Sequence, residues 1–254
     1  MTPLAFELVA AVIGGLIVGS FLNVVIHRLP RGESLIRPRS RCPACTVSLR
    51  ARDNVPVLSW LALRGRCHEC ANPISPRYPL VEAATAALFV AVVLASSSSA
   101  DIALGLLAVC VLMPVALIDL DHRIIPNRLL LPAAVAAVVA GTLLDPGGEP
   151  GRLIAAAAAG GFLLVAALVR PAGMGMGDVK LAAVMGLLLG GAVAVAMLIA
   201  LVLGVLVGAV IMSRRGVAAG RRTAVPFGPM LSAGGLVGVL AGASLVTWYL
   251  GTFT

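Results

Sequence analysis

Charged side chains are scarce in this sequence. Only 12% of its 254 residues are charged, whereas 60% are hydrophobic and the mean hydropathy is +1.05. Such a composition excludes an ordinary soluble domain and indicates a membrane protein with several spans. Acidic residues (11) are fewer than basic ones (19), which gives a net charge of +8. We do not interpret this charge as a nucleic-acid surface, because basic loops are what membrane topology predicts.

Lysine and arginine are absent from the first ten residues. A cleaved signal peptide begins with basic residues and has a shorter apolar run. We therefore expect the first apolar run to remain in the protein as a span.

Eight apolar runs predict an all-α polytopic membrane protein of about eight transmembrane helices. Each span needs roughly 20 residues to cross ~30 Å of hydrocarbon, and the run 181–189 falls short of this. There the pair Gly190-Gly191 is either a tight turn or part of a longer tilted helix. The runs are 4–26, 80–95, 102–118, 129–144, 153–169, 181–189, 192–212 and 227–250. We predict a first transmembrane helix (1–26), a small hydrophilic insertion (27–79) and a transmembrane core (80–254).

The basic residues orient these spans. Segments 27–79, 119–128, 170–180 and 213–222 hold 18 of the 19 lysines and arginines. Positive loops stay on the cytoplasmic side, so we expect these four segments there and both termini outside. Asp119 and Asp178 then lie on the same cytoplasmic face, at the membrane boundary.

Two CxxC pairs predict a metal site in the hydrophilic segment. Its candidate ligands are Cys42, Cys45, Cys67 and Cys70. Two such pairs complete a tetrahedron around Zn²⁺, and a segment with so small a core needs the metal's stability. Disulfides and ligand-free cysteines are the alternatives, and the reducing cytosol disfavours disulfides. His68 could replace one cysteine, whereas Cys110 is simplest as a small buried hydrophobe.

Asp119 and Asp178 each stand where an apolar run meets a polar segment, an expensive place for a carboxylate. Two adjacent carboxylates share one proton, so one can act as base and the other as acid in peptide hydrolysis. We expect Asp178, at a helix start, to be the resting base and Asp119 to hold the proton. Gly175 and Gly177 leave room for an extended substrate backbone.

Each of these residues also has a structural interpretation. In the structural interpretation, Asp178 serves solely as a helix cap and Asp119 solely as a charge in a loop. Lys180 is either a topology residue or a group that tunes the acids. Glu82, just inside the second run, is either functional or paired for structure. The arginines of the hydrophilic segment could contact anionic lipid headgroups.

With these residues, the sequence resembles the bacterial type IV prepilin peptidases, which are GxGD intramembrane aspartic proteases. Besides the paired CxxC, the motifs that carry the resemblance occur in family order at 19–30, 75–82, 118–127, 175–180 and 225–229. A lone GxGD would be a weak signal, but the ordered set is specific.

The resemblance implies that the substrate is the short basic leader of prepilins or pseudopilins, cut at the cytoplasmic face of the inner membrane. It places the catalytic pair on Asp119 and Asp178. Relatives with a cysteine segment also N-methylate the new first residue with S-adenosylmethionine. The resemblance assigns no residue to this cofactor and leaves the oligomeric state open. The rival hypotheses are an ion-coupled transporter, disfavoured by acids at the membrane edge, and a non-catalytic zinc scaffold.

Overall fold

The computed structural model describes residues 2–42, 44–170, 174–216 and 225–251. Within these ranges the regular elements are helices, as predicted, and no strand is formed. The α-helices are α1 (Pro3–Arg28), α2 (Leu58–Ala62), α3 (Arg77–Ala95), α4 (Ser99–His122), α5 (Asn127–Leu144), α6 (Glu149–Val169), α7 (Met176–Leu189), α8 (Val193–Arg215) and α10 (Gly228–Gly251). Three short 3-10 turns are η1 (Leu29–Arg31), η2 (Ala51–Asn54) and η3 (Gly190–Ala192).

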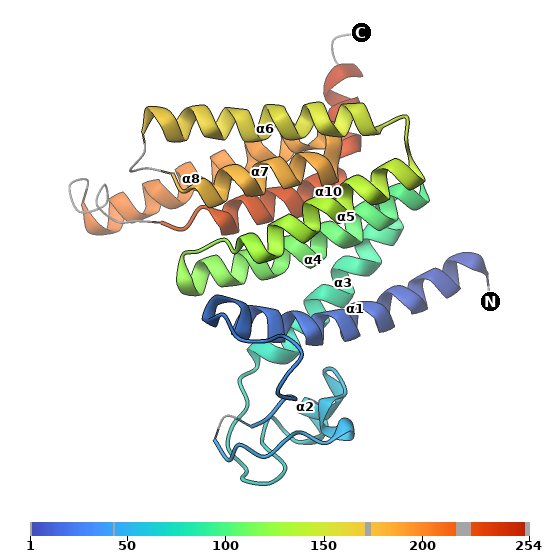
Figure 1. The fold of residues 1–254 in the computed structure, drawn as a ribbon, viewed down its shortest axis with the longest axis vertical. Helices are drawn as coiled ribbons and strands as arrows, with labels where there is room; N and C mark the ends of the chain where they lie inside the picture. The colour runs from blue at the N-terminus through green and yellow to red at the C-terminus, as the bar shows by residue number, and fades with distance from the viewer. Residues whose placement is uncertain (1, 43, 171–173, 217–224, 252–254) are drawn as a thin grey trace. The chain divides into compact units, whose positions relative to one another are not determined.

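Each predicted apolar run coincides with one long helix (Figure 1). In the described residues, six stretches are long and apolar enough to cross a membrane. One of these six stretches, Met176–Arg214, includes both α7 and α8. The part of α10 from Gly228 to Gly242 is apolar but shorter, and it is not one of the six. Gly190, at a left-handed φ of +56°, interrupts the helix between α7 and α8. The number of eight spans stays a prediction.

The chain forms two compact units, 1–94 and 95–254. In the first unit, α1 packs against α3 through glycines. A Cβ on Gly15 would lie 2.5 Å from the Cα of Ala86, and a Cβ on Gly19 would lie 2.7 Å from the Cα of Glu82. Asn23 Nδ2 donates a hydrogen bond to the carbonyl of Tyr78 (3.0 Å). Small residues thus allow the close helix contact that is common in membranes.

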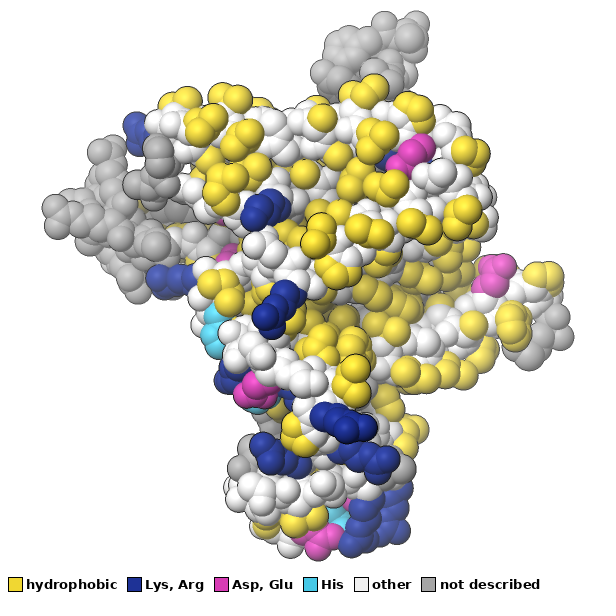
Figure 2. Space-filling model, viewed as in Figure 1, with side chains coloured by type: hydrophobic (Ala, Val, Ile, Leu, Met, Phe, Trp, Pro, Cys, Tyr) yellow, Lys and Arg dark blue, Asp and Glu magenta, His cyan; other side chains and the backbone are white. Residues whose placement is uncertain are grey.

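In the second unit, α6 packs on α7, while α10 packs on α8 and α4, and α5 on α4 and α7 (Figure 1). Gly186 of α7 lies directly against the backbone of Ala156, and Gly234 of α10 against the carbonyl of Ala196. Side chains such as Leu112, Leu181 and Met185 are fully buried between these helices. Many others point outward, and Figure 2 shows the hydrophobic surface that they form. Such a surface suits contact with lipid.

Consecutive helices of the second unit run in alternating directions. Figure 1 shows the ends of α4, α6 and α8 at one end of the unit, together with the starts of α5, α7 and α10. Asp119 and Asp178 therefore lie at the same end, as the sequence predicted. We call this end the dyad end.

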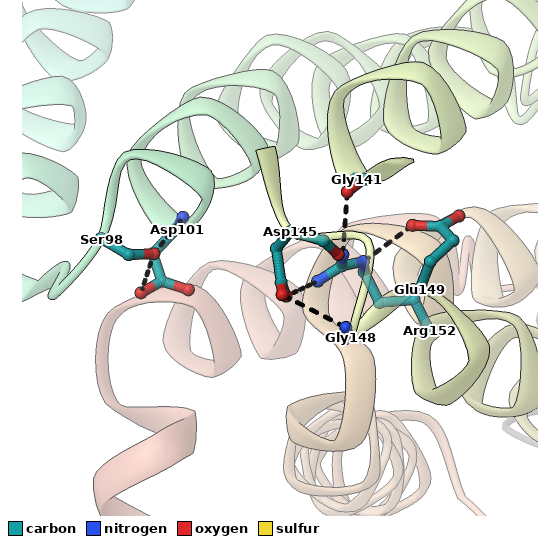
Figure 3. A network of polar contacts seen from close by, with 7 residues as sticks. All are labelled: Ser98, Asp101, Gly141, Asp145, Gly148, Glu149 and Arg152. Atoms are coloured by element: carbon teal, nitrogen blue, oxygen red, sulfur yellow. Dashed lines mark hydrogen bonds and ion pairs between the residues drawn. The ribbon is translucent and has the colours of Figure 1, made fainter. Parts of the chain in front are cut away.

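The opposite end is closed by a polar cluster around Arg152, in the first turns of α6 (Figure 3). Its guanidinium pairs with Asp145 (2.9 Å) and Glu149 (3.1 Å), and it donates to the carbonyls of Gly141 and Asp145. The hydrogen bonds from Arg152 lower the pKa of the Asp145 carboxyl. We call these residues the arginine clamp, because they tie the end of α5 to the start of α6.

Candidate active site and metal centre

Asp119 lies in the last turn of α4 and is 5% exposed. Arg123, in the left-handed conformation (φ +55°), ends this helix, and its N–H donates to the carbonyl of Asp119 (2.9 Å). The side-chain carboxylate accepts a buried hydrogen bond at Oδ2 from the N–H of Gly228 (2.9 Å). This contact spans 109 positions of the chain and joins α4 to the start of α10.

Gly228 is a residue that reasoning from the sequence missed. A Cβ at this position would lie 2.7 Å from Asp119 Oδ2 and 3.0 Å from its Cγ, so only glycine allows the backbone to approach the carboxylate this closely. In the same turn, the N–H groups of Met230 and Leu231 bond to Phe227, and Pro229 has none. One signal could have revealed the contact: Phe-Gly-Pro opens an apolar run at the end where Asp119 is expected.

Asp178 is 9% exposed and is the third residue of α7. Its Oδ2 accepts a hydrogen bond from the N–H of Gly175 (3.3 Å), which precedes the helix. A carboxylate at this position satisfies a free helix N–H and is favoured by the helix dipole. Asp178 therefore does cap its helix, and capping leaves its other oxygen available for chemistry.

The two carboxylates are near enough to interact electrostatically. Among the described residues, neither has an ion pair; Arg123 adds a more distant positive charge near Asp119. Buried carboxylates without a cation are costly, and two neighbouring ones lower that cost by sharing a proton. The arrangement can therefore supply one acid and one base to the same reacting group.

Gly175, Gly177 and Lys180, which were also predicted for this site, lie beside Asp178 at the start of α7. Gly177 packs on Ile125, where a Cβ would come within 3.0 Å of the isoleucine Cβ, and Gly175 has more room. Lys180 Nζ bonds to Asn127 Oδ1 (3.0 Å) rather than to either acid. It thus links α7 to the start of α5. Gly173, two residues before Gly175, lies outside the described residues.

Glu82 belongs to the first unit. It is 8% exposed, and its Oε2 accepts a hydrogen bond from the N–H of Val57 (2.7 Å). Val57 has a left-handed φ of +59°, which is strained for a β-branched residue. Glu82 therefore has a structural partner in the cysteine segment, which it ties to α3.

The four predicted metal ligands converge in the same unit. The Sγ atoms of Cys42, Cys45, Cys67 and Cys70 all lie within 4.8 Å of one another. His68 is not part of the cluster. Cys110 is half-buried in α4, on the other unit.

The two cysteine turns repeat one backbone pattern. In each, the N–H of the first cysteine donates to the carbonyl five residues later, and its carbonyl accepts the N–H of the residue four later. The first turn pairs Cys42 with Val47 (3.0 Å) and Thr46 (2.9 Å), and the second pairs Cys67 with Asn72 (2.9 Å) and Ala71 (3.0 Å). Thr46 and Ala71, at equivalent positions, both have a left-handed φ.

The thiols differ in acidity. Backbone hydrogen bonds from Cys45 and Ala44 lower the pKa of Cys42 to about 6. The N–H of Asn72 lowers the pKa of Cys70, but burial and the neighbouring thiols outweigh it and raise that pKa to about 12. Four thiolates this close need a cation to neutralise them. The donor set therefore fits Zn²⁺, which four cysteines bind as a tetrahedron.

Comparison with known proteins agrees with these features. A profile described as the bacterial peptidase A24 N-terminal domain matches residues 13–96, and one described as the type IV leader peptidase family matches residues 106–212. No solved structure matches.

Several curated relatives are named prepilin leader peptidase/N-methyltransferase. The protein from Myxococcus xanthus is 50% identical over 124 residues, which cover 49% of this chain but only 37% of that relative. The proteins from Aeromonas hydrophila and Stutzerimonas stutzeri are each 36% identical, over 94% and 98% of this chain and 92% and 95% of the relatives. The chain belongs to the type IV leader peptidase family.

Proposed function

We propose that this protein is a multi-pass inner-membrane peptidase that removes the leader of prepilins or pseudopilins and N-methylates the new first residue. The names of the relatives support both activities, and disfavour a transporter or a scaffold. The observation that carries the proposal is a pair of buried carboxylates at one end of a helical bundle. Backbone N–H groups hold them, and neither has an ion pair with any residue that the structure describes.

In the mechanism that we propose, Asp178 is ionised and takes a proton from water, while Asp119 is protonated and polarises the scissile carbonyl. The hydroxide adds to the carbonyl carbon, and the proton from Asp178 then passes to the leaving amine as the C–N bond breaks. The start of α7 favours negative charge on Asp178, and the end of α4 disfavours it on Asp119. A site-resolved titration in which Asp119 ionises first would reverse the two roles.

The orientation in the membrane follows from charge. At the dyad end of the second unit lie Arg123, Arg128, Arg170 and Lys180, whereas the arginine clamp has more acidic than basic groups. We therefore assign the dyad end to the cytoplasm and both termini to the outside. The orientation is measured by labelling single cysteines, placed at positions 128 and 147, with a reagent that does not cross the membrane. Labelling of position 128 from the outside would overturn it.

We assign three regions to the chain, as predicted from the sequence. Residues 1–26 form the first helix, 27–79 the methyltransferase-associated zinc segment and 80–254 the peptidase core. The converging thiols support Zn²⁺, which would be structural, because four cysteines leave no open position. S-adenosylmethionine as methyl donor rests on the family alone. Gly175, Gly177 and Lys180 would shape the substrate side of the site, and Glu82 would hold the zinc segment to α3.

The peptidase proposal is tested with purified protein and a prepilin peptide. Asp119→Asn and Asp178→Asn should each lower kcat by roughly a thousandfold or more, because either variant removes one member of a unit that acts together. Asp121→Asn is the matched control, since this exposed acid lies two residues from Asp119; it should stay within about threefold of wild type. Processing by both dyad variants would refute the aspartic mechanism.

The zinc and methylation proposals need a separate measurement. Cys42→Ser should lower the zinc content of the purified protein and abolish addition of a methyl group, measured by mass spectrometry of the cleaved product. His68→Ala is the control and should keep its metal. Full zinc content in the Cys42 variant would exclude the four-cysteine site.

A further inference from the structure

Ser232 of α10 is a buried hydroxyl without a partner. Its side chain is 1% exposed, and its Oγ has no hydrogen bond within the described part of the chain. A buried serine in a helix normally bonds to the carbonyl four residues earlier. Among the side chains that the structure describes, the other buried polar atom without a partner is Glu149 Oε1, but Arg152 binds that carboxylate through its second oxygen. Ser232 therefore needs an explanation that Glu149 does not.

The position of Ser232 on α10 directs it to the helices that carry the two acids. Gly228, Ser232 and Gly235 are spaced by four and three residues, so they share one helix face. At one end of this face, Gly228 meets Asp119. At the other, a Cβ on Gly235 would lie 2.7 Å from Leu112 Cδ1 of α4 and 3.0 Å from the Met185 methyl of α7. Ser232 lies between these contacts.

The direction of a helical side chain brings the hydroxyl closer to the acids. Helix side chains lean toward the N-terminus and cover the preceding turn. For Ser232 that turn holds Gly228, which has no side chain to intervene. The hydroxyl is thus directed toward the point where the backbone of α10 meets the Asp119 carboxylate.

We propose that Ser232 is a third polar group of the active site and that its Oγ accepts a hydrogen bond from the attacking water. This inference rests on the proposed peptidase function. A water molecule between two carboxylates has two hydrogens, and the base takes only one of them. An acceptor for the second hydrogen fixes the orientation of the lone pair that attacks the carbonyl, and such orientation contributes to rate. The hydroxyl then lacks a protein partner because its partner is the water.

Two substitutions separate this role from a hydroxyl that is merely tolerated. Ser232→Ala removes the acceptor with little change in volume, and Ser232→Thr retains it. The control is Ser213→Ala, which removes an exposed hydroxyl of α8 that bonds to Val210. Wild type and Asp119→Asn are assayed beside them with the same prepilin peptide. The measurements are kcat, KM and the melting temperature in detergent.

We expect Ser232→Ala to lower kcat by about 10- to 100-fold, as loss of one positioned polar group does, with KM within about twofold. Its melting temperature should be unchanged or higher, since the protein offers the hydroxyl no partner. Ser232→Thr should recover most of the activity.

Unchanged kcat in Ser232→Ala would overturn the inference. A lower melting temperature in that variant would overturn it too, because the hydroxyl would then have a structural partner. If wild type itself fails to process the peptide, the peptidase proposal fails instead. If Asp119→Asn is inactive and Ser232→Ala is fully active, only the role of Ser232 is lost.

Discussion

Carboxylates at the two ends of the second unit have opposite surroundings. At the arginine clamp, Asp145 and Glu149 share the guanidinium of Arg152. At the dyad end, Asp119 and Asp178 each receive one backbone N–H, and neither has an ion pair among the described residues. A paired carboxylate is fixed in its charged state, whereas an unpaired one can still change its protonation. In the function that we propose, the clamp therefore serves stability and the dyad end serves chemistry.

The largest effect on stability should come from Arg152→Met. The substitution leaves Glu149 buried without its cation, which should lower the stability by about 2 kcal/mol. The melting temperature in detergent measures it, and kcat of the folded fraction should remain near that of wild type. A variant that melts like wild type but cleaves poorly would place chemistry at the clamp and remove the contrast.

A matched pair of glycines sharpens the comparison further. Gly228 and Gly148 each lie where an added Cβ would meet a carboxylate, that of Asp119 and that of Asp145. Gly228→Ala should lower kcat by about 10-fold, because it moves Asp119 away from its N–H donor. Its pH–activity profile should also change on the limb that depends on Asp119, because this carboxylate loses its N–H donor.

Gly148→Ala is the control for this pair. Its added Cβ would displace the partly exposed carboxylate of Asp145 and press on the Arg152 guanidinium. The substitution should therefore lower the melting temperature slightly and leave the pH–activity profile in place. If both variants lost activity equally, the loss would come from disturbed helix packing and not from displacement of the Asp119 carboxylate.

A smaller effect is expected for the stability of Asp178→Asn. The amide oxygen can still accept the Gly175 N–H, while one of two neighbouring buried acids is removed. The variant should therefore be inactive yet as stable as wild type, or more stable by about 1 kcal/mol. Asp145→Asn should show the reverse, with lower stability and normal activity. Calorimetry of the two variants decides this, and destabilisation by Asp178→Asn would indicate a structural acid.

The smallest effect concerns pH. Arg152 holds the pKa of Asp145 below its ordinary value of 3.8. A lowered pKa in the folded state contributes stability above the ordinary value, and this stability is lost as pH falls through the folded pKa. The melting temperature should therefore decline below about pH 4, and only gently, because Asp145 is partly exposed. In Arg152→Met this component of the decline should disappear; an identical decline would assign it to other acids.

Much of the fold could be predicted because it depends on local composition. Each apolar run became a helix, and the alternation of spans placed Asp119 and Asp178 at the same end. The cysteine spacing likewise predicted the converging thiols. These features follow from short stretches of sequence, or from the even number of spans between Asp119 and Asp178.

Features set by tertiary packing could not be predicted in this way. The bond from Gly228 to Asp119 depends on how α10 is rotated against α4. The sequence left Gly190-Gly191 as either a turn or part of a longer helix, and the positive φ of Gly190 decides for the break. It likewise left Glu82 as functional or paired for structure, and its partner, the N–H of Val57, comes from a loop that the sequence did not place. Lys180 was expected to be either a topology residue or a group that tunes the acids. The bond from Lys180 to Asn127 could not be foreseen, because it depends on how α5 packs beside α7.

The repeated pattern of the two cysteine turns has a consequence for how the segment responds to metal. Each turn already has its left-handed residue and its internal hydrogen bonds, so each presents two sulfur atoms without help from the other. Removal of the metal by a chelator should then let the two cysteine turns move apart, while the backbone within each turn keeps its conformation. Amide hydrogen exchange in the apo-protein would show protection retained at Cys42 and Cys67 while the surroundings of both turns become accessible to solvent.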